Sequence, residues 1–392
     1  MKANLIAFTK VNTPNENFDL NAALGFCAKM AGICYSQEGF SKLENEDPEA
    51  TAKRLTRVLT SGHHSVFDHF KLTFELCNIP KIIAMLLNNE KDYATSEKSA
   101  RYTHFKELPS PQGELYEKWC KKLTPIIRDM YPNLLKPKAK DPEFQIKKLA
   151  QENARYFVSI FEPQTIMGYT VSLRQLNYLI YMFKDYVKNA EKNNFNDKLI
   201  PYINEFIKLF DDYVVEGLIP SGKNRRLSLF GEKEYFNIPD MFSYVYQTSY
   251  EASFSCVAQV QRHRTEPIFI YVLNEFKFYV PEIIKDDEAL VSEWLQDADS
   301  LKDTFPQGTL VKVVQTGNID TLILKGLERA CGAAQLETMK HTVDILNKAT
   351  EVSDFSSKII EKTNNSTARC KFTGYKCSTP CIFGANQFNR KI

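Results

Sequence analysis

The chain has 392 residues, of which 43% are hydrophobic and 25% charged, and its formal net charge is +2. These values are typical of a soluble globular protein with room for two or three cores. They exclude the strongly basic surface that nucleic acids or anionic membranes select, so we expect neither as a partner. We find no signal-peptide pattern and no run of about 18 apolar residues, which predicts a cytoplasmic protein.

The first half of the chain mixes helical and strand patterns. Apolar residues recur at helical spacing over 20–34 and 50–61, residues 70–76 alternate as a strand does, and Pro80 opens another helical stretch. A long helical pattern covers 196–218. The Pro, Ser, Gly and basic residues that follow it, at 219–226, indicate a linker.

The second half repeats this order of elements. A strand-like run covers 252–260, a second strand begins at Thr309, and a helix is predicted from 319 to 348. From 352 on the chain is polar and carries cysteines, which predicts a separate appendage. Neither half contains the glycine-rich signature of a Rossmann or P-loop nucleotide site. Any nucleotide must therefore be held by side chains, a task that suits the planar, always charged guanidinium of arginine.

Three short motifs carry chemistry. They are SGHHSVFDHFKLTFEL at 61–76, EKSARY at 97–102 and QRHRT at 261–265. Each has a plain alternative. An isolated Arg-His-Arg is most often a solvated basic face, Glu97 and Arg101 are spaced as a helix-surface ion pair, and the two histidines after Gly62 suit a polar turn.

Together these motifs resemble the flavin-dependent thymidylate synthases. The first resembles the family's histidine and phenylalanine segment, QRHRT its Arg-His-Arg signature, and EKSARY the Glu-x-Ser-x-Arg-Tyr that follows this signature in the family. In this chain the two signatures lie in opposite halves. The first half has residues 89–91 in the Arg-His-Arg slot, and the second half has no Glu-x-Ser-x-Arg after Arg264.

The same exchange continues downstream. The first half matches family arginines at Arg155 and Arg174, but a later arginine position falls on Phe183. The second half has that arginine as Arg329 and has Asp320 in the place of Arg174. It also supplies the remaining matches, Asn318, Gln335 and Glu337. The pattern resembles an internal duplication in which each copy has kept what the other has lost.

We therefore predict an α/β (α+β) fold with two tandem synthase-like domains, each a small, mainly antiparallel sheet flanked by helices. The predicted boundaries are 1–218 for the first copy, 219–233 for the linker, 234–350 for the second copy and 351–392 for a cysteine-containing tail. Members of the family are tetramers that assemble each site from several protomers. The resemblance therefore implies a homodimer equivalent to a tetramer of single copies.

The resemblance implies reductive methylation of dUMP to dTMP with FAD as cofactor and with methylenetetrahydrofolate and NADPH as cosubstrates. It assigns catalytic roles to Gln259, Arg262 and Arg329. It assigns dUMP binding to Glu97, Ser99, Arg101, Arg155, Gln259, Arg262 and Arg329. It assigns FAD binding to His63, Ser65, Arg174, Arg262, His263, Arg264, Asn318 and Arg329.

Two other functions remain open. The unusual segment after Arg264 leaves room for a related flavin-dependent enzyme that places a different group on C5 of a pyrimidine nucleotide. A catalytically decayed paralogue that only binds flavin or nucleotide is the other alternative. The complementary pattern of losses speaks against it, because random decay would not keep one good version of each motif.

The tail raises a separate question. Cys370, Cys377 and Cys381 lie close enough in sequence to share zinc or an iron–sulfur cluster, with Cys331 or a histidine as a fourth ligand. Three reduced thiols in a small apolar knot are the alternative. The Pro-Cys pair at 380–381 resembles the nucleophile of the other thymidylate synthase family, but the histidine expected next is Ile382.

Overall fold

A computed structural model describes residues 1–10, 17–101, 103–105, 107–220, 227–363, 370, 374, 376–377, 383 and 388–392. The chain forms two compact units, and each is discontinuous in sequence. Unit 1 consists of Met1–Lys98 and Pro163–Leu227, and unit 2 consists of Ser99–Glu162 and Ser228–Ile392.

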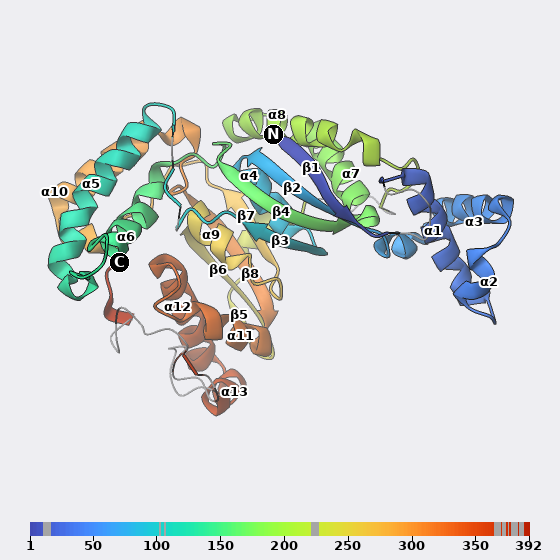
Figure 1. The fold of residues 1–392 in the computed structure, drawn as a ribbon. Coiled ribbons are helices and arrows are strands. Elements are labelled where there is room, and N and C mark those ends of the chain that lie inside the picture. The colour runs from blue at the N-terminus through green and yellow to red at the C-terminus, as the bar shows by residue number, and fades with distance from the viewer. Residues whose placement is uncertain are drawn as a thin grey trace. The chain divides into compact units, whose positions relative to one another are not determined.

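Unit 1 is built on a four-stranded antiparallel sheet of order β1-β2-β4-β3 (Figure 1). Its strands are β1 (Lys2–Phe8), β2 (Lys71–Ile79), β3 (Tyr93–Glu97) and β4 (Thr165–Ser172). Its helices are α1 (Leu20–Gly32), α2 (Phe40–Glu44), α3 (Pro48–Ser61), α4 (Lys81–Asn89), α7 (Leu173–Asn189) and α8 (Asn194–Leu209).

One face of the unit 1 sheet is buried because the central strands alternate large apolar residues with polar ones. Leu72, Phe74 and Leu76 of β2 are at most 1% exposed. Helices α4, α7 and α8 supply the apolar partners, and Phe210 after α8 packs edge-on to Phe74 with ring centroids 5.0 Å apart. This core fixes the β4–α7 junction, where a predicted site residue lies.

Unit 2 contains a second four-stranded antiparallel sheet, of order β5-β6-β8-β7. Its strands are β5 (Met241–Phe242), β6 (Val245–Ser253), β7 (Ile268–Val272) and β8 (Leu310–Asn318). Its helices are α5 (Gln112–Met130), α6 (Phe144–Ala154), α9 (Phe254–Val260), α10 (Glu288–Ser300), α11 (Ile319–Arg329), α12 (Leu336–Val352) and α13 (Asp354–Thr363).

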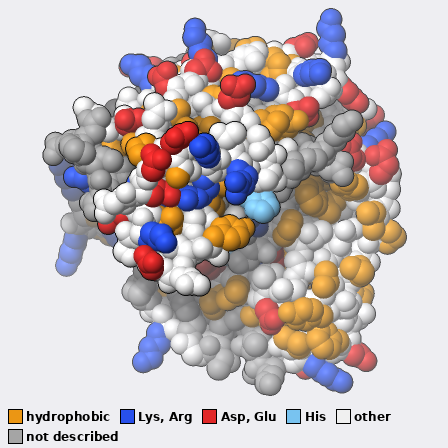
Figure 2. Space-filling model, turned by 90° about the vertical axis from the view of Figure 1, so that its right-hand side faces the viewer, with side chains coloured by type: hydrophobic (Ala, Val, Ile, Leu, Met, Phe, Trp, Pro, Cys, Tyr) orange, Lys and Arg blue, Asp and Glu red, His pale blue; other side chains and the backbone are white. Residues whose placement is uncertain are grey.

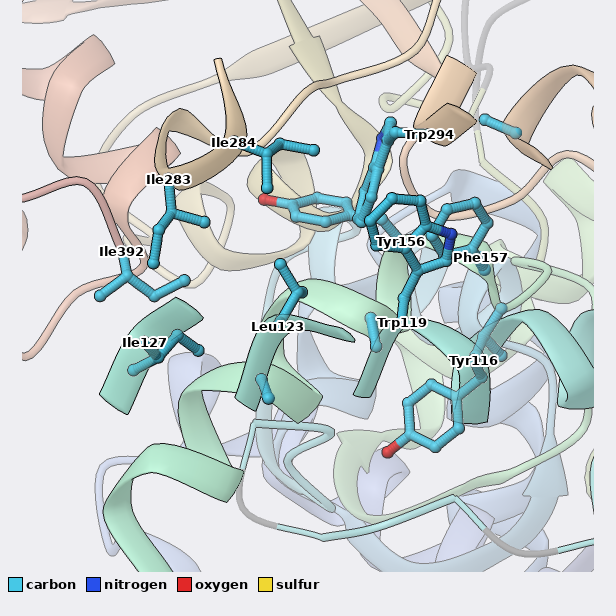
Figure 3. Packing of buried hydrophobic residues seen from close by; sticks show 14 of the residues in the cluster. Tyr116, Trp119, Leu123, Ile127, Tyr156, Phe157, Ile283, Ile284, Trp294 and Ile392 are labelled. Carbon is cyan, nitrogen blue, oxygen red and sulfur yellow. The ribbon is translucent and has the colours of Figure 1, made fainter. Parts of the chain in front are cut away.

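Helices α5, α6 and α10 form a helical layer of unit 2 around an aromatic core (Figures 1 and 3). Trp119 and Trp294 meet edge-on at 4.7 Å between ring centroids, and Phe157 packs on both indoles. The indole N–H of Trp119 donates to the Asp297 carboxylate at 2.8 Å, so the buried polar atom is satisfied. This core joins the segment 99–162 to the second half of the chain.

The two sheets share their topology. In each, a strand is followed at once by a helix whose N-cap side chain bonds the backbone N–H three residues on: Ser172 caps α7 and Asn318 caps α11. The registers also correspond. Glu97 pairs with Met167 five residues before the end of β4, and Ile270 pairs with Val313 five residues before the end of β8.

The predicted fold class is confirmed in its coarser form, as two antiparallel sheets with helices, but several element predictions were wrong. The run 252–260 is strand only to Ser253 and continues as α9, because Ser253 caps a helix there. The helix expected over 319–348 breaks between α11 and α12. The helix expected over 196–218 ends at Leu209.

The compact units also differ from the predicted contiguous stretches. Residues 99–162 pack in unit 2, where the backbone N–H of Gln307 donates to the carbonyl of Val158 at 2.8 Å. Within the predicted linker, residues 221–226 lie outside the described residues, and Phe230 forms a parallel bridge with Ile270. The expected appendage is not separate where it is described, because Ile360 and Ile392 pack into cores of unit 2. The sequence boundaries of the two copies stay a prediction.

Among the helices of the described ranges, none combines the length and the apolar character that crossing a bilayer needs. On the face drawn in Figure 2, acidic and basic side chains are interspersed. That face therefore offers no extended field of a single sign, in keeping with the small net charge.

Candidate functional site

The Arg-His-Arg segment forms the turn directly after α9 in unit 2. The backbone N–H of Gln261 closes the helix on Val257, and His263 turns back onto Val260 with an N–H···O distance of 3.0 Å. This turn leaves His263 buried, Arg262 half-buried and Arg264 exposed. The apolar residues that precede the motif pack α9 into the core, which fixes the start of the turn.

His263 is a neutral member of this segment. Burial, followed by the positive charges of Arg329 and Lys325, lowers the pKa of His263 to about 3. The carboxylate of Glu328 lies 3.5 Å from Nε2 but is mostly exposed, so it does not outweigh burial. At neutral pH the motif therefore presents two guanidinium charges on either side of an uncharged imidazole.

Arg329, the last residue of α11, adds a third guanidinium. Its Nη2 donates to the backbone carbonyl of Gln259 at 3.4 Å, which ties the end of α11 to α9. Burial lowers the pKa of Arg329, and the like charges of Arg101 and Arg262 lower it further, against the opposing charge of Glu328. Guanidiniums that repel one another at a partly buried position are typical of an anion-binding site.

Arg101 reaches the same part of unit 2 from the first half of the chain. Its Nε donates to the Glu152 carboxylate at 2.9 Å and its Nη2 to the carbonyl of Ala333 at 2.8 Å. Its backbone N–H bonds the hydroxyl of Ser99 at 3.3 Å. The alternative of a helix-surface pair with Glu97 is wrong, because Glu97 lies in β3 of unit 1.

Arg155 completes the set. It is 6% exposed, and its Nη2 donates to the side-chain carbonyl of Gln335. The backbone N–H of Gln335 in turn donates to Oε1 of Gln259 at 3.2 Å. The loop 330–335 between α11 and α12 thus connects Arg101, Arg155 and Gln259.

Glu337, in the first turn of α12, anchors this loop to the sheet. Its carboxylate accepts from the Ser253 backbone N–H at 2.7 Å, from the Ser253 hydroxyl at 2.6 Å and from the Tyr156 hydroxyl at 3.0 Å. Burial raises the pKa of Glu337, while these bonds and the charge of Arg155 oppose the rise. The β6–α9 junction, α12 and the segment after α6 are therefore held by one buried network.

Two of the predicted substrate-binding arginines of unit 2 have a buried donor that is not used among the described residues. The Nε–H groups of Arg155 and Arg329 are buried and meet no acceptor among the described residues. A buried donor without a partner is costly, so such groups mark a place for a ligand acceptor. The donors are charged, which favours an anionic group such as a phosphate.

The predicted flavin residues of unit 1 lie in and beside the short 3₁₀ helix His64–Asp68. His63 and Ser65 are exposed, whereas His64 between them is 3% exposed. The His64 imidazole bonds the Tyr178 hydroxyl at 2.9 Å and the Leu59 carbonyl at 3.0 Å. The buried histidine therefore anchors a turn that presents its two neighbours to solvent.

Arg174 belongs to the same network. Its Nη1 donates to the Asp68 carboxylate at 2.7 Å, its guanidinium lies 5.0 Å from the centre of the Tyr178 ring, and its Nε meets no acceptor among the described residues. Ser172 donates its hydroxyl to the other Asp68 oxygen at 2.7 Å. The N-terminus of α7 is thereby fixed to the histidine turn.

The remaining predicted residues are in structural contacts. Glu97 binds Lys81 at 2.6 Å and the side-chain amide of Asn88 at 3.1 Å within unit 1. In unit 2, Oδ1 of Asn318 accepts from the Thr321 backbone N–H at 2.9 Å as the cap of α11. The substrate set thus lies in unit 2 apart from Glu97, and the flavin set has members in each unit.

Of the three tail cysteines predicted to bind a metal, Cys381 lies outside the described residues. Cys370 and Cys377 are exposed. A different group, Cys256, Glu337 and His341, has potential ligand atoms within 4.8 Å of one another. The hydrogen bonds of Glu337 already employ its carboxylate, and burial raises the pKa of the Cys256 thiol, so this group forms part of the buried network.

Sequence reasoning missed several residues of the site. Glu152 is the counter-ion of Arg101, and its i, i+3 spacing from Arg155 was a usable signal, although no helix was predicted over these residues. Tyr156 gave no such signal, because its role depends on Glu337, which is 181 positions away. Gln335 was matched by motif but not assigned to the site.

Fold and site together describe an α+β protein with an arginine-rich candidate site. Comparison with known proteins shows what the chain is similar to. Residues 19–198 match the family model described as thymidylate synthase complementing protein, Thy1. The flavin-dependent thymidylate synthase of Pyrococcus abyssi is 27% identical over 158 residues, which cover 37% of this chain and 57% of that enzyme. Over residues 19–198 the chain is thus similar to the Thy1 family, and its curated relatives are flavin-dependent thymidylate synthases.

Other relatives are similarly distant. The flavin-dependent thymidylate synthase of Pyrococcus furiosus is 24% identical over 192 residues, 45% of this chain and 68% of that enzyme. A crystal structure of ThyX from Helicobacter pylori complexed with FAD and dUMP is similar over 55% of this chain and 100% of that chain, with 17% identity and a TM-score of 0.30. The chain thus spans 57% of the length of the P. abyssi enzyme, and the family match ends before the Arg-His-Arg segment.

Proposed function

We propose that this protein is a flavin-dependent thymidylate synthase that converts dUMP to dTMP with methylenetetrahydrofolate and NADPH. The observation that carries the proposal is the meeting of separated motifs in unit 2. Arg101 from the first half and Arg329 from the second both bond backbone or loop atoms around residues 330–335 and Gln259. A decayed protein would have no reason to keep this convergence.

The arginines of unit 2 are the groups we assign to the dUMP phosphate. Arg101, Arg155 and Arg329 are charged forks, and the last two keep buried Nε–H donors for which the described residues offer no acceptor. Burial and the repulsion by Arg101 and Arg262 both lower the pKa of Arg329, and a phosphate dianion would offset them. Ser99 would add a neutral hydroxyl donor.

Gln259 and Arg262 are assigned to the pyrimidine. Both are half-buried, and the Gln259 side chain is oriented by the Gln335 backbone N–H at 3.2 Å. A fixed amide and a guanidinium stabilise the negative charge that develops on the ring as C5 becomes nucleophilic. The imidazole of His263 is neutral at pH 7 because its pKa is lowered to about 3, so Arg262 is the charged group of this pair.

FAD fits the residues of unit 1 that we assign to it. Exposed His63 and Ser65 are free to bond a ligand, and Arg174 has a buried Nε–H without an acceptor in the described ranges, as an anionic diphosphate would require. When bound and reduced by NADPH, the flavin would supply the hydride that reduces the transferred one-carbon unit. The task of this chain is to bind and orient it, for which His64 and Asp68 hold the donors in place.

Internal duplication explains why the motifs are divided, and the sheet registers support it. Seven positions separate Glu90 from Glu97, and seven separate His263 from Ile270, its partner in register. Positions 90 and 263 thus stand at the same distance from their strand partners, which supports the proposed alignment of the two copies. Fusion of two copies allows one site type to be kept while the other loses its chemistry, and we expect a homodimer.

The test is release of tritium from 5-tritiated dUMP, with FAD, NADPH and methylenetetrahydrofolate each omitted in turn. We expect release that needs all three, with dTMP as the product by mass spectrometry. Arg262→Met should reduce it at least about 100-fold. The control is Arg128→Met on α5, an arginine paired with Glu143 on the surface of the same unit.

The other outcomes separate the alternatives. Release with a product other than dTMP would identify a related enzyme that modifies C5 with a different group. If the protein binds flavin but releases no tritium, we would conclude that its substrate is a nucleotide other than dUMP. If the protein neither releases tritium nor binds flavin, the decayed paralogue is the remaining alternative.

A further inference from the structure

The last described residues, 388–392, return to the loop that connects the site arginines. Phe388 packs against Leu336 and Met339 beside this loop. Ile392 is 4% exposed and packs near Ile127 and Ile283 in the helical core, as Figure 3 shows. The segment is thus anchored by apolar side chains on both sides of the residue between them, Arg390.

Polar contacts fix the same segment. The backbone N–H of Lys391 donates to the Tyr131 hydroxyl at 2.8 Å, and the Lys391 ammonium pairs with Asp286. The Arg390 guanidinium lies 4.7 Å from the centre of the Phe383 ring. These contacts leave Arg390 only 5% exposed and aimed at the loop rather than at solvent.

Arg390 holds two of three consecutive loop carbonyls. Its Nη1 donates to the Gly332 carbonyl at 2.9 Å and its Nη2 to the Ala334 carbonyl. The carbonyl between them, of Ala333, accepts from Arg101 at 2.8 Å. Two arginines far apart in sequence therefore hold one turn of backbone.

We propose that Arg390 is a positioning residue for nucleotide binding, acting through the loop 330–335. The inference rests on the proposed function. The loop orients Arg101 through Ala333 and both Arg155 and Gln259 through Gln335. Loss of the Arg390 fork would leave two loop carbonyls without this donor, and the loop would no longer hold the phosphate-binding arginines in one geometry.

The experiment compares Arg390→Met with Lys391→Met. Methionine keeps an unbranched stem in each case, but only the first change removes donors from the loop. Hydrogen exchange is read on the peptide that contains residues 330–336, where the Ala334 and Gln335 amides are bonded within the site. We expect at least 10-fold faster exchange there in Arg390→Met and no change in Lys391→Met.

Nucleotide affinity is the second readout. The dUMP dissociation constant should rise about 10- to 100-fold in Arg390→Met and stay within about twofold of wild type in Lys391→Met. Arg390→Lys keeps the charge but not the fork. It should recover part of the dUMP affinity, and it is the variant to use should Arg390→Met fail to fold.

Unchanged exchange in the loop, or a dUMP affinity within twofold of wild type in a folded Arg390 variant, would overturn the inference. Failure of the proposed function gives a different result. In that case the wild-type protein itself would not bind dUMP, while the exchange comparison would still report whether Arg390 holds the loop.

Discussion

The two strand–helix junctions of this protein have the same construction but opposite chemistry. The eleventh residue of α7 is Phe183, which is fully buried beside Phe206, and the eleventh residue of α11 is Arg329, which joins the anion site. At the second helical position, Arg174 in α7 corresponds to Asp320 in α11. The comparison teaches that one position of this strand–helix junction can hold either an apolar side chain packed in a core or a partly buried guanidinium.

The largest expected effect separates the two eleventh positions. Arg329→Met should lower tritium release from 5-tritiated dUMP by about 100- to 1,000-fold, because it removes a charged donor from the phosphate site. Phe183→Leu should leave activity per folded molecule within about twofold and lower the free energy of unfolding by about 1–2 kcal/mol. Chemical denaturation and the tritium assay on both variants check this. Equal losses of activity would mean that the two positions have not diverged in function.

The second expected effect concerns the segment 99–162, which comes from the first half of the chain but packs in unit 2. Arg101→Lys keeps the charge but cannot bond Glu152 and Ala333 together through one planar fork. The dUMP dissociation constant should rise about 10-fold by calorimetry. Arg128→Lys, a surface change on α5, is the matched control and should leave affinity unaltered. A normal affinity in Arg101→Lys would place the phosphate elsewhere.

Local patterns predicted those parts of the fold that do not depend on distant segments. Strand β2 was predicted because the alternation of apolar and polar residues is a local pattern. Helices α1 and α3 were predicted because the helical spacing of their apolar residues is also local. Helix α9 was mistaken for a strand because its run is apolar on every side. Such a run fits either structure, and here it continues as a helix whose first turn is capped by the Ser253 side chain. Residues of an interior element carry too little periodic signal to decide.

The candidate site was predictable wherever a motif carried it. Arg101, Arg155 and Arg329 were expected to belong to one substrate set, and the structure brings them to one loop and its surroundings. Glu337 as an anchor and Arg390 as a clamp were not foreseen, since their contacts join segments far apart in sequence. Only the folded chain brings such pairs together.

The third expected effect is pH dependence. His263 is the register counterpart of Glu90, and burial lowers its pKa to about 3, below the unfolded value of about 6.5. Because the unfolded chain binds the proton more tightly, stability is complete above pH 6.5 and falls as the pH drops below it. When the pH is lowered from 7.5 to 5, the free energy of unfolding should decrease in both proteins. The decrease should be about 1–2 kcal/mol smaller in His263→Asn than in the wild type. The exposed His69→Asn should follow the wild type, and an identical slope in His263→Asn would contradict the prediction.

The smallest expected effect tests what the two junctions still share. Ser172 and Asn318 cap α7 and α11 through the same bond to the third backbone N–H of the helix. Ser172→Ala should lower the free energy of unfolding by about 1–2 kcal/mol, because it removes the cap and the bond to Asp68. Asn318→Ala should cost about 1 kcal/mol, and Asn318→Ser should cost little, since serine is the cap that the other junction already uses. Urea denaturation of the three variants measures these differences. A full loss in Asn318→Ser would show that the two junctions no longer accept the same cap, and that their likeness is confined to strand order.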